Sequence, residues 1–221
     1  MKLVAEDVWQ LTGFPPHGIN EYLVGDVLVD AGARFSRSQI MRDLRGRTLS
    51  AHVLTHAHAD HQGASAAVCE RFGVPLWVGE ADADAAERPE LIRERQPDAA
   101  INHAFFRMFA GPGRPVDRRL REGDEVGQFR VLDTPGHSRG HIALWRESDR
   151  TLIAGDVLNS QHPLFGFPRG LRLPLDVFTP DRDENRRSAK RLGELEPRLV
   201  LLGHGPPVRD PAAFAAFCLA L

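Results

Sequence analysis

Cysteine is scarce in this chain of 221 residues, which contains only two. Cys69 and Cys218 lie far apart in the sequence, and both fall in stretches that we expect to be helical. Two such residues are too few for a disulfide framework, and they cannot supply the clustered thiolates of a structural zinc site. We therefore predict that both are small core residues.

The chain also lacks long hydrophobic runs. No stretch approaches the ~20 consecutive apolar residues that are needed to cross a bilayer. The first seven residues include Glu6 and Asp7, where a signal peptide needs an unbroken apolar segment. These absences argue against a membrane-spanning protein and predict a cytoplasmic location, with no membrane among the partners.

An excess of charge of one sign is missing as well. The 28 Lys and Arg residues nearly balance the 30 Asp and Glu residues, for a net charge of −2. A protein that binds nucleic acid normally carries a basic patch, so we expect a small-molecule substrate and no nucleic acid. An apolar fraction of 42% is typical of a globular protein, and we predict one domain, residues 1–221, compatible with a homodimer.

Metal-binding side chains, in contrast, are abundant in one place. Residues 55–61 read Thr-His-Ala-His-Ala-Asp-His. The apolar residues just before them predict a buried strand, whose alternation places His56 and His58 on the same side. Asp60 and His61 come next, where a helix begins, and can face a second cation. Imidazoles with a carboxylate suit zinc, iron or manganese, so the motif predicts half of a two-metal site.

Three further ligand candidates follow predicted strands. His137 lies in a Thr-Pro-Gly-His turn, Asp156 follows Ala-Gly, and His204 stands between two glycines. Each of these turns is common when taken alone. Their appearance in this order after the central motif predicts a complete set of metal ligands, with Asp156 as the bridging carboxylate.

The order of predicted elements is strands, helices, strands, helices. This order indicates two sheets packed face to face, with helices on their outer faces. A helix from 36 to 44 is expected to begin with Ser36 as its N-cap. The expected strands are 4–11, 22–24, 27–30, 53–54, 75–78, 118–120, 129–133, 142–145, 151–154 and 199–202, and the other main helices are 64–72, 80–87 and 181–195.

Three features each allow two interpretations. Asp30 either caps a turn or orients a metal ligand from behind. His141 either makes a hydrogen bond behind the ligands or is an ordinary core histidine. Prolines interrupt residues 88–115, and the apolar cluster at residues 105–109 shows no obvious period. That cluster is either a satellite of the core, which we favour, or an apolar wall of the substrate pocket.

From Asn20 to Gly205 the sequence resembles the metallo-β-lactamase-fold hydrolase superfamily. Residues 134–141 (Thr-Pro-Gly-His-Ser-Arg-Gly-His) and Gly155-Asp156 resemble its glyoxalase II-like branch. The resemblance implies an α/β fold, the four-layer αββα sandwich, with metals at one edge between the sheets. It also implies that the first metal is held by His56, His58 and His137, the second by Asp60, His61 and His204, and that Asp156 bridges them.

The chain departs from the named branches at positions that contact substrate. Glyoxalase II enzymes have an added C-terminal helical domain and pocket tyrosines, whereas only a short segment follows Gly205 here and the single tyrosine is Tyr22. Lactonases of the superfamily place a tyrosine three residues after the bridging aspartate, where this chain has Asn159. The resemblance therefore does not imply glutathione thioesters or homoserine lactones as the specific substrate.

The predicted activity is hydrolysis at a dinuclear site. Two divalent ions, zinc first and iron or manganese next, would hold a bridging hydroxide at neutral pH, and Asp60 would assist proton transfer to the leaving group. The alternative is a persulfide dioxygenase. Those enzymes resemble glyoxalase II but use one iron, held by the equivalents of His56, His137 and Asp156 or nearby members of the set. Metal identity and count separate the two.

Substrate specificity is expected to come from the loop at residues 159–173. It combines aromatic residues, an arginine and turn residues without a regular period. The predicted substrate is a small ester, thioester or lactone with an apolar part and, in some cases, a carboxylate. The candidate substrate-binding residues are Asn159, Phe165, Phe167 and Arg169 in this loop, together with Arg139.

Overall fold

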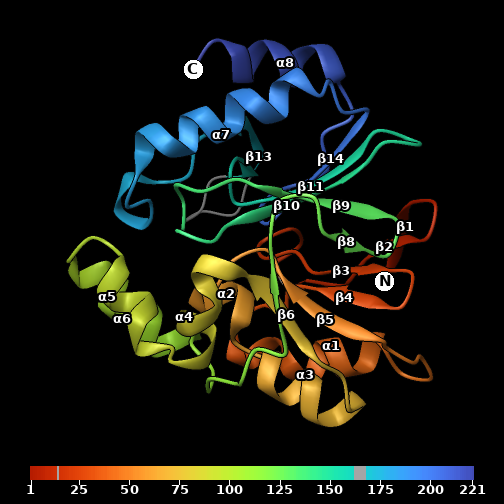
Figure 1. Cartoon of the computed structure of the whole chain (residues 1–221), viewed down its shortest axis with the longest axis vertical. Coiled ribbons are helices and arrows are strands. Elements are labelled where there is room, and N and C mark those ends of the chain that lie inside the picture. Colours follow the sequence, from red (N-terminus) through yellow and green to blue (C-terminus); the bar gives the residue numbers. More distant parts are fainter. Residues whose placement is uncertain (14, 162–167) are drawn as a thin grey trace.

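The computed structural model describes residues 1–13, 15–161 and 168–221. Two β-sheets lie face to face in the middle of the molecule, and helices cover their outer surfaces (Figure 1). The predicted αββα sandwich is therefore confirmed.

The first sheet has seven strands in the order β1 to β7. Strands β1 to β4 are antiparallel neighbours, whereas the pairs β4–β5, β5–β6 and β6–β7 are parallel. The central strands β4 and β5 are buried along their whole length, which explains their continuous apolar sequence. The strands are β1 (Lys2–Ala5), β2 (Val8–Gln10), β3 (Tyr22–Val24), β4 (Val27–Val29), β5 (Ala51–Leu54), β6 (Leu76–Gly79) and β7 (Arg118–Leu120).

The second sheet has five strands in the order β14-β11-β10-β9-β8. Strands β11 and β14 are parallel, and β10 runs antiparallel to both β9 and β11. Strands β9, β11 and β14 consequently point the same way and end at the same edge. The strands are β8 (Glu125–Val126), β9 (Phe129–Asp133), β10 (Ile142–Arg146), β11 (Thr151–Gly155) and β14 (Leu199–Leu202), and a separate pair is formed by β12 (Asn159–Gln161) and β13 (Pro168–Arg172).

Helices α1 and α3 cover the first sheet, α7 and α8 cover the second, and α4 to α6 lie beside one end of the sandwich (Figure 1). Short 3-10 turns are η1 (Arg34–Ser36), η2 (Glu80–Asp82) and η3 (Asp176–Phe178). The helices are α1 (Arg37–Asp43), α2 (Ala59–Gln62), α3 (Ser65–Phe72), α4 (Ala83–Glu87), α5 (Glu90–Arg95), α6 (Ala100–Phe109), α7 (Arg182–Glu194) and α8 (Pro211–Leu219).

The main core lies between the two sheets. Tyr22 and Val53 from the first sheet pack with Phe129, Leu144 and Leu201 from the second, and all five are buried. Burying each such side chain stabilises the fold by about 1.5–3 kcal/mol relative to leaving it exposed. Separate clusters lie under the outer helices, so each sheet is covered on both faces.

Two predictions near the N-terminus are wrong in detail. The strand expected at 4–11 is a hairpin of β1 and β2, because Asp7 adopts a left-handed conformation with φ of 51° and reverses the chain. Ser36 precedes α1, but its side chain makes no capping hydrogen bond. Ser36 ends the turn η1 with helical backbone angles, so it does not have the extended conformation of a typical N-cap.

Two segments expected to be irregular contain regular structure. Residues 159–173 include β12 and β13, which pair with each other. Residues 88–115 contain α5 and α6, which are short enough to fit between the prolines. Both cysteine predictions are confirmed, because Cys69 and Cys218 are free and buried. Burial raises the pKa of the Cys69 thiol to about 11 and that of Cys218 to about 12.

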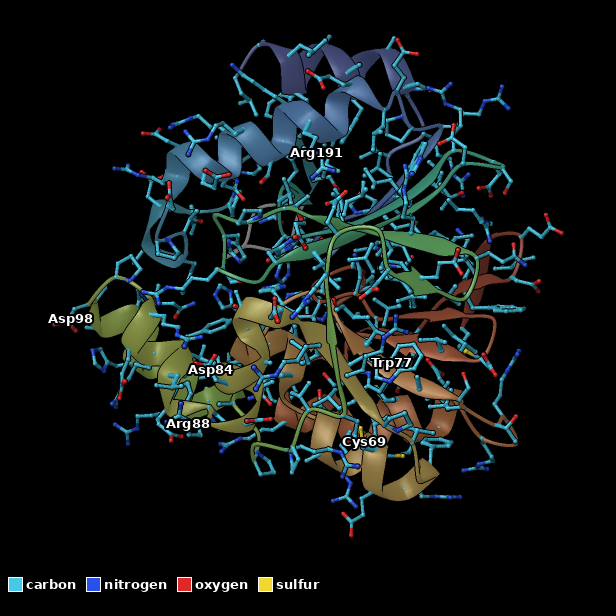
Figure 2. All side chains as sticks on the ribbon, viewed as in Figure 1. Cys69, Trp77, Asp84, Arg88, Asp98 and Arg191 are labelled. Atoms are coloured by element: carbon cyan, nitrogen blue, oxygen red, sulfur yellow. The ribbon has the colours of Figure 1, made fainter. Side chains whose placement is uncertain are left out.

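Cys69 lies on α3, below the first sheet, whereas Arg191 lies on α7, above the second sheet (Figure 2). Within residues 1–13, 15–161 and 168–221, no helix combines the length and the apolar character that crossing a membrane requires.

Candidate metal centre and substrate pocket

The candidate ligands gather where strands of both sheets end. His56 and His58 follow β5, and the short helix α2 then carries Asp60 and His61. Because β9, β11 and β14 end at one edge of the second sheet, the residues just after them meet at that edge. They are His137, Asp156 and His204.

The ligand atoms of these side chains form overlapping groups. Within each group, one nitrogen or oxygen atom from every member lies within 4.8 Å of the others. The structure thus brings together all seven side chains that the sequence singles out. The groups are His56, His58 and His137; His56, His61 and Asp156; and Asp60, His61 and His204.

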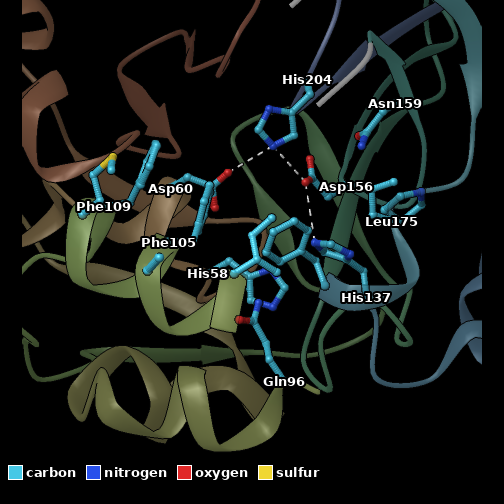
Figure 3. A pocket seen from close by; sticks show the side chains of 15 residues that line it. His58, Asp60, Gln96, Phe105, Phe109, His137, Asp156, Asn159, Leu175 and His204 are labelled. Atoms are coloured by element: carbon cyan, nitrogen blue, oxygen red, sulfur yellow. Dashed lines mark ion pairs between the residues drawn. The ribbon is translucent and has the colours of Figure 1, made fainter. Parts of the chain in front are cut away.

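Asp156 lies between the first and the third of these groups. Its Oδ2 atom is 3.1 Å from His204 Nε2 and 3.5 Å from His137 Nε2, and its Oδ1 atom is 3.7 Å from His61 Nε2. Asp60 Oδ2 lies 3.2 Å from the same Nε2 atom of His204. Figure 3 shows Asp156 between His137 and His204, with Asp60 opposite. A carboxylate in this position can contact cations in both groups.

In His56, His61 and His204, the outward ring nitrogen has a partner that turns Nε2 toward the cluster. His61 Nδ1 donates to Asp30 Oδ2 at 3.0 Å. Thr55 Oγ1 donates to Asp30 and therefore accepts from His56 Nδ1 at 3.0 Å. His204 Nδ1 donates to a backbone carbonyl oxygen, that of Gly18. These hydrogen bonds leave the Nε2 lone pairs facing inward, as metal ligands require.

Electrostatics separates the histidines into two kinds. Burial and the neighbouring imidazoles hold the pKa of His56 and of His137 well below the usual value, so both rings are neutral. Burial opposes a charge on His204 too, but Asp156 outweighs it and raises the pKa of His204 to about 10. Burial likewise opposes ionisation of Asp156, yet His204 and His61 keep its pKa well below the usual value. Metal binding would displace the imidazole protons.

Three buried atoms of the cluster test whether a metal fits. His56 Nε2, His61 Nε2 and Asp156 Oδ1 have no hydrogen-bond partner among the described residues. Unpaired buried polar atoms are costly, and three in one cluster are explained by ions that they would bind. Gly203 adds to the fit, because a Cβ there would lie 2.0 Å from Asp156 Oδ1. The donor set of imidazoles and carboxylates suits zinc, iron or manganese.

Asp30 is the main support behind the ligands. It is buried, and besides His61 its carboxylate accepts hydrogen bonds from the backbone N–H and the hydroxyl of Thr55, each at 2.8 Å. Through Thr55 it also orients His56. Of the two interpretations of Asp30, the structure supports the one in which it orients metal ligands.

We expect Asp30→Asn to weaken metal binding by about 10- to 100-fold, the usual cost of losing a partner behind a ligand. The amide can present one oxygen only, so it cannot serve His61 and Thr55 as the carboxylate does. Chelator competition on the purified variant measures the dissociation constant. An unchanged constant, with the fold intact by circular dichroism, would show that Asp30 only shapes the turn after β4.

His141 also supports the site and is not itself a ligand. Its Nε2 atom accepts the backbone N–H of Asp156 at 3.0 Å, and its Nδ1 atom donates to Thr134 Oγ1 at 2.8 Å. Both ring nitrogens are therefore used. Of the two interpretations of His141, the hydrogen-bonding one is supported.

Asp82 joins the two loops that carry first-group histidines, and sequence reasoning missed it. One carboxylate oxygen accepts hydrogen bonds from the backbone N–H of Ala57 at 3.0 Å and from Ser138 Oγ at 2.5 Å. The other accepts the backbone N–H of Gly140 at 2.9 Å. Ala57 separates His56 from His58. Asp82 thus ties the loop after β5 to the loop after β9.

A cavity of about 240 Å³ opens above the ligands. Asn159, which is predicted to bind substrate, is among the residues that line it, and so are Phe105 and Phe109 on α6. Phe106 packs instead against the core cluster under the first sheet. Both interpretations of the residue 105–109 cluster therefore hold in part, each for different phenylalanines. Figure 3 shows Phe105 and Phe109 facing the pocket on the Asp60 side and Leu175 on the His137 side.

The other predicted substrate contacts do not meet there in the part of the chain that is described. Arg139 is exposed and lines a separate depression with Glu80 and Arg121, because its neighbours Ser138 and Gly140 are held inward by Asp82. Phe165 and Phe167 lie outside the described residues. Arg169 belongs to β13, but its side chain is also outside the described part.

The apolar wall of the cavity corresponds to a helical pattern of apolar residues in the sequence. Spacings of three and four residues place five side chains on one face of α6, and all five line the cavity. The expectation that this segment has no period is therefore wrong. The period is helical, but it becomes visible only when the window begins at residue 101. The five residues are Ile101, Ala104, Phe105, Met108 and Phe109.

Comparison with known proteins agrees with this geometry. Residues 15–204 match the Metallo-beta-lactamase superfamily. The probable metallo-hydrolase YflN of Bacillus subtilis is 30% identical over 200 residues, which are 82% of this chain and 76% of YflN. A hydroxyacylglutathione hydrolase of Bdellovibrio bacteriovorus is 27% identical over 69% of this chain, but the match covers only 47% of that protein.

Among solved structures, TTHA1623 in a di-iron-bound form is 27% identical, with a TM-score of 0.65 over 97% of this chain and 94% of TTHA1623. A sandwich of two sheets with histidines and aspartates at one edge is the arrangement of a metallo-hydrolase. The chain belongs to the metallo-β-lactamase superfamily.

Proposed function

We propose that this protein is a hydrolase with a dinuclear metal centre that cleaves a small ester, thioester or lactone. One observation carries the proposal: beneath an apolar cavity, Asp156 lies 3.5 Å from His137 of the first ligand group and 3.1 Å from His204 of the third. In this proposal the first ion is held by His56, His58 and His137, the second by Asp60, His61 and His204, and Asp156 contacts both. Zinc is the proposed ion, although iron and manganese suit the same donors.

The bound ions would supply a hydroxide nucleophile at neutral pH and would stabilise negative charge on the substrate oxygen. The chain's own residues complete the reaction. Asp60 lines the cavity, and although burial opposes its ionisation, His61 and His204 lower its pKa. It is thus a carboxylate that can take a proton from the attacking water and deliver it to the departing oxygen or sulfur. The apolar wall of α6 keeps bulk water away from this transfer.

The glyoxalase II-like branch is the part of the superfamily that we propose for this chain. Its support is the stretch from Thr134 to His141, together with the similarity to a hydroxyacylglutathione hydrolase. A cavity of about 240 Å³ is smaller than typical pockets for drug-sized ligands, at about 300–1,000 Å³. This size favours a small-molecule substrate over a nucleic acid. Because of the similarity to a hydroxyacylglutathione hydrolase, the substrate panel should include thioesters as well as esters.

The test combines metal analysis with a panel of substrates. We expect close to two equivalents of zinc, manganese or iron per chain, and turnover of at least one of the esters, thioesters or lactones. Turnover should disappear after chelation and return when zinc is added. One equivalent of iron with oxygen uptake on a persulfide would replace the proposal by the dioxygenase alternative. A fully metal-loaded protein that cleaves nothing on the panel would contradict it.

A further inference from the structure

The apolar face of α6 is held rigidly over the metal ligands. Next to this face on the helix, Asn102 is buried and donates to the carbonyl oxygens of Pro97 and Val177, each at 2.7 Å. At its C-terminal end, α6 leads to Gly111, which packs so closely on Gly63 that a Cβ would lie 1.8 Å from the Gly63 carbonyl oxygen. Gly63 directly follows α2, which carries Asp60. The position of α6 is therefore fixed relative to the site.

This apolar face continues out of the cavity to the surface. Met108 lines the cavity and is still 56% exposed, and Ile101 is 39% exposed. Phe109 contacts Phe35 edge to face, with ring centroids 5.2 Å apart, and Phe35 is 58% exposed. Single exposed apolar residues are ordinary, but here they form one track that begins at the candidate metal centre.

The track is narrow as well as apolar. Pro174, Leu175 and Phe178 complete the cavity lining, and the rings of Phe105 and Phe178 are in contact, with centroids 5.3 Å apart, so they close the cavity where they meet. Phe105 also stacks on Phe109 at 4.1 Å. A cavity of about 240 Å³ is too small for an α-helix of ~10 Å diameter, whereas an extended hydrocarbon chain is thin enough to enter it.

We propose that this track, formed by Phe35, Ile101, Phe105, Met108 and Phe109, is a subsite for an unbranched, uncharged hydrocarbon chain. Because the inner end of the track is the candidate metal centre, its occupant places a reacting group there, so it is the substrate itself. The inference rests on the proposed function. It assigns as substrate an ester, thioester or lactone whose acyl or alkyl chain lies along α6 and extends beyond the cavity.

The test uses methyl alkyl ketones from 2-hexanone to 2-decanone, which carry a carbonyl but no leaving group. Their affinities for the metal-loaded protein, measured by calorimetry, do not depend on catalysis. We expect affinity to rise roughly fourfold with each added methylene, the gain from burying one methylene group. An affinity that does not change with chain length would overturn the proposal, even if short esters are cleaved.

A pair of matched variants locates the chain. In Met108→Glu the gain for each methylene should fall below about twofold, because the added carboxylate stays hydrated beside the chain. The control is Leu219→Glu on α8, a residue that is also 56% exposed but lies outside the cavity lining, and it should keep the wild-type gain. Equal loss in both variants would overturn the proposal. So would a dimer that Met108→Glu converts to monomer, since the track would then be a self-association face.

Failure of this inference is distinguishable from failure of the proposed function. Ketone binding that strengthens with chain length, without cleavage of any ester, thioester or lactone, would support the subsite and contradict the hydrolase. Cleavage of short substrates, together with ketone binding that does not depend on chain length, would support the hydrolase and contradict the subsite.

Discussion

Replacing Asp156 by alanine is expected to abolish turnover and to remove bound metal while leaving a folded chain. Asp156 is the carboxylate placed between the first and third groups of ligands, 3.1 Å from His204 and 3.5 Å from His137. Its loss would leave His204 and His61 without their main negative partner. We expect turnover to fall by more than the ~10²–10³-fold that the loss of one electrostatic stabiliser costs an enzyme.

Elemental analysis, turnover and circular dichroism of Asp156→Ala should be measured together. His58→Ala is expected to behave in the same way, because His58 belongs to the first group. Asp183→Ala is a matched control, since Asp183 is an exposed carboxylate in the first turn of α7 and pairs with Arg186. Full activity in Asp156→Ala, or in the metal-stripped wild type, would contradict the proposed metal-dependent function.

Asp82→Ala is expected to have the second largest effect, although Asp82 belongs to none of the ligand groups. Its removal leaves the backbone N–H groups of Ala57 and Gly140, as well as the hydroxyl of Ser138, without their acceptor. Each unsatisfied buried group costs about 1–3 kcal/mol. We therefore expect a loss of about 3 kcal/mol or more in unfolding free energy and a 10- to 100-fold loss in metal affinity.

Denaturant unfolding and chelator competition measure the two effects separately. Asp82→Asn should lose less of both, because its amide oxygen can still accept from one of the loops. The control is Asp84→Ala, in the adjoining helix α4, where the carboxylate pairs with Arg95 at the surface (Figure 2). Surface pairs contribute about 0–1 kcal/mol, so this variant should keep wild-type metal affinity. Wild-type metal affinity in Asp82→Ala would show that the two loops hold their own shape.

Local sequence patterns were enough to predict which side chains gather at the candidate metal centre. The residues from His56 to His61 lie within one short stretch, so their proximity follows from the chain itself. His137, Asp156 and His204 each follow an apolar strand, and parallel neighbours such as β11 and β14 end at the same edge. The αββα layers follow from the same alternation of strand and helix patterns.

The hydrogen bonds that support the ligands from behind were harder to predict from the sequence. Asp82 lies 25 residues from Ala57 and 58 residues from Gly140, and nothing in its local sequence marks it as their partner. Asp30 could be read as a turn residue equally well, because the choice depends on His61, 31 residues away. Such hydrogen bonds exist only when distant strands and loops have been brought together.

The sequence by itself indicated a site for divalent cations, because imidazoles and carboxylates at these spacings are the donors that such cations prefer. Only the tertiary structure decided what the cations face. The helical period of α6 defines an apolar stripe, but a stripe can cover a core or line a cavity, and the sequence pattern is the same for both. The packing of α6 against α2 and the hydrogen bonds of Asn102 to Pro97 and Val177 place Phe105 and Phe109 beside the metal ligands. The hydrogen bonds of Ser138 and Gly140 to Asp82 leave Arg139 outside the pocket.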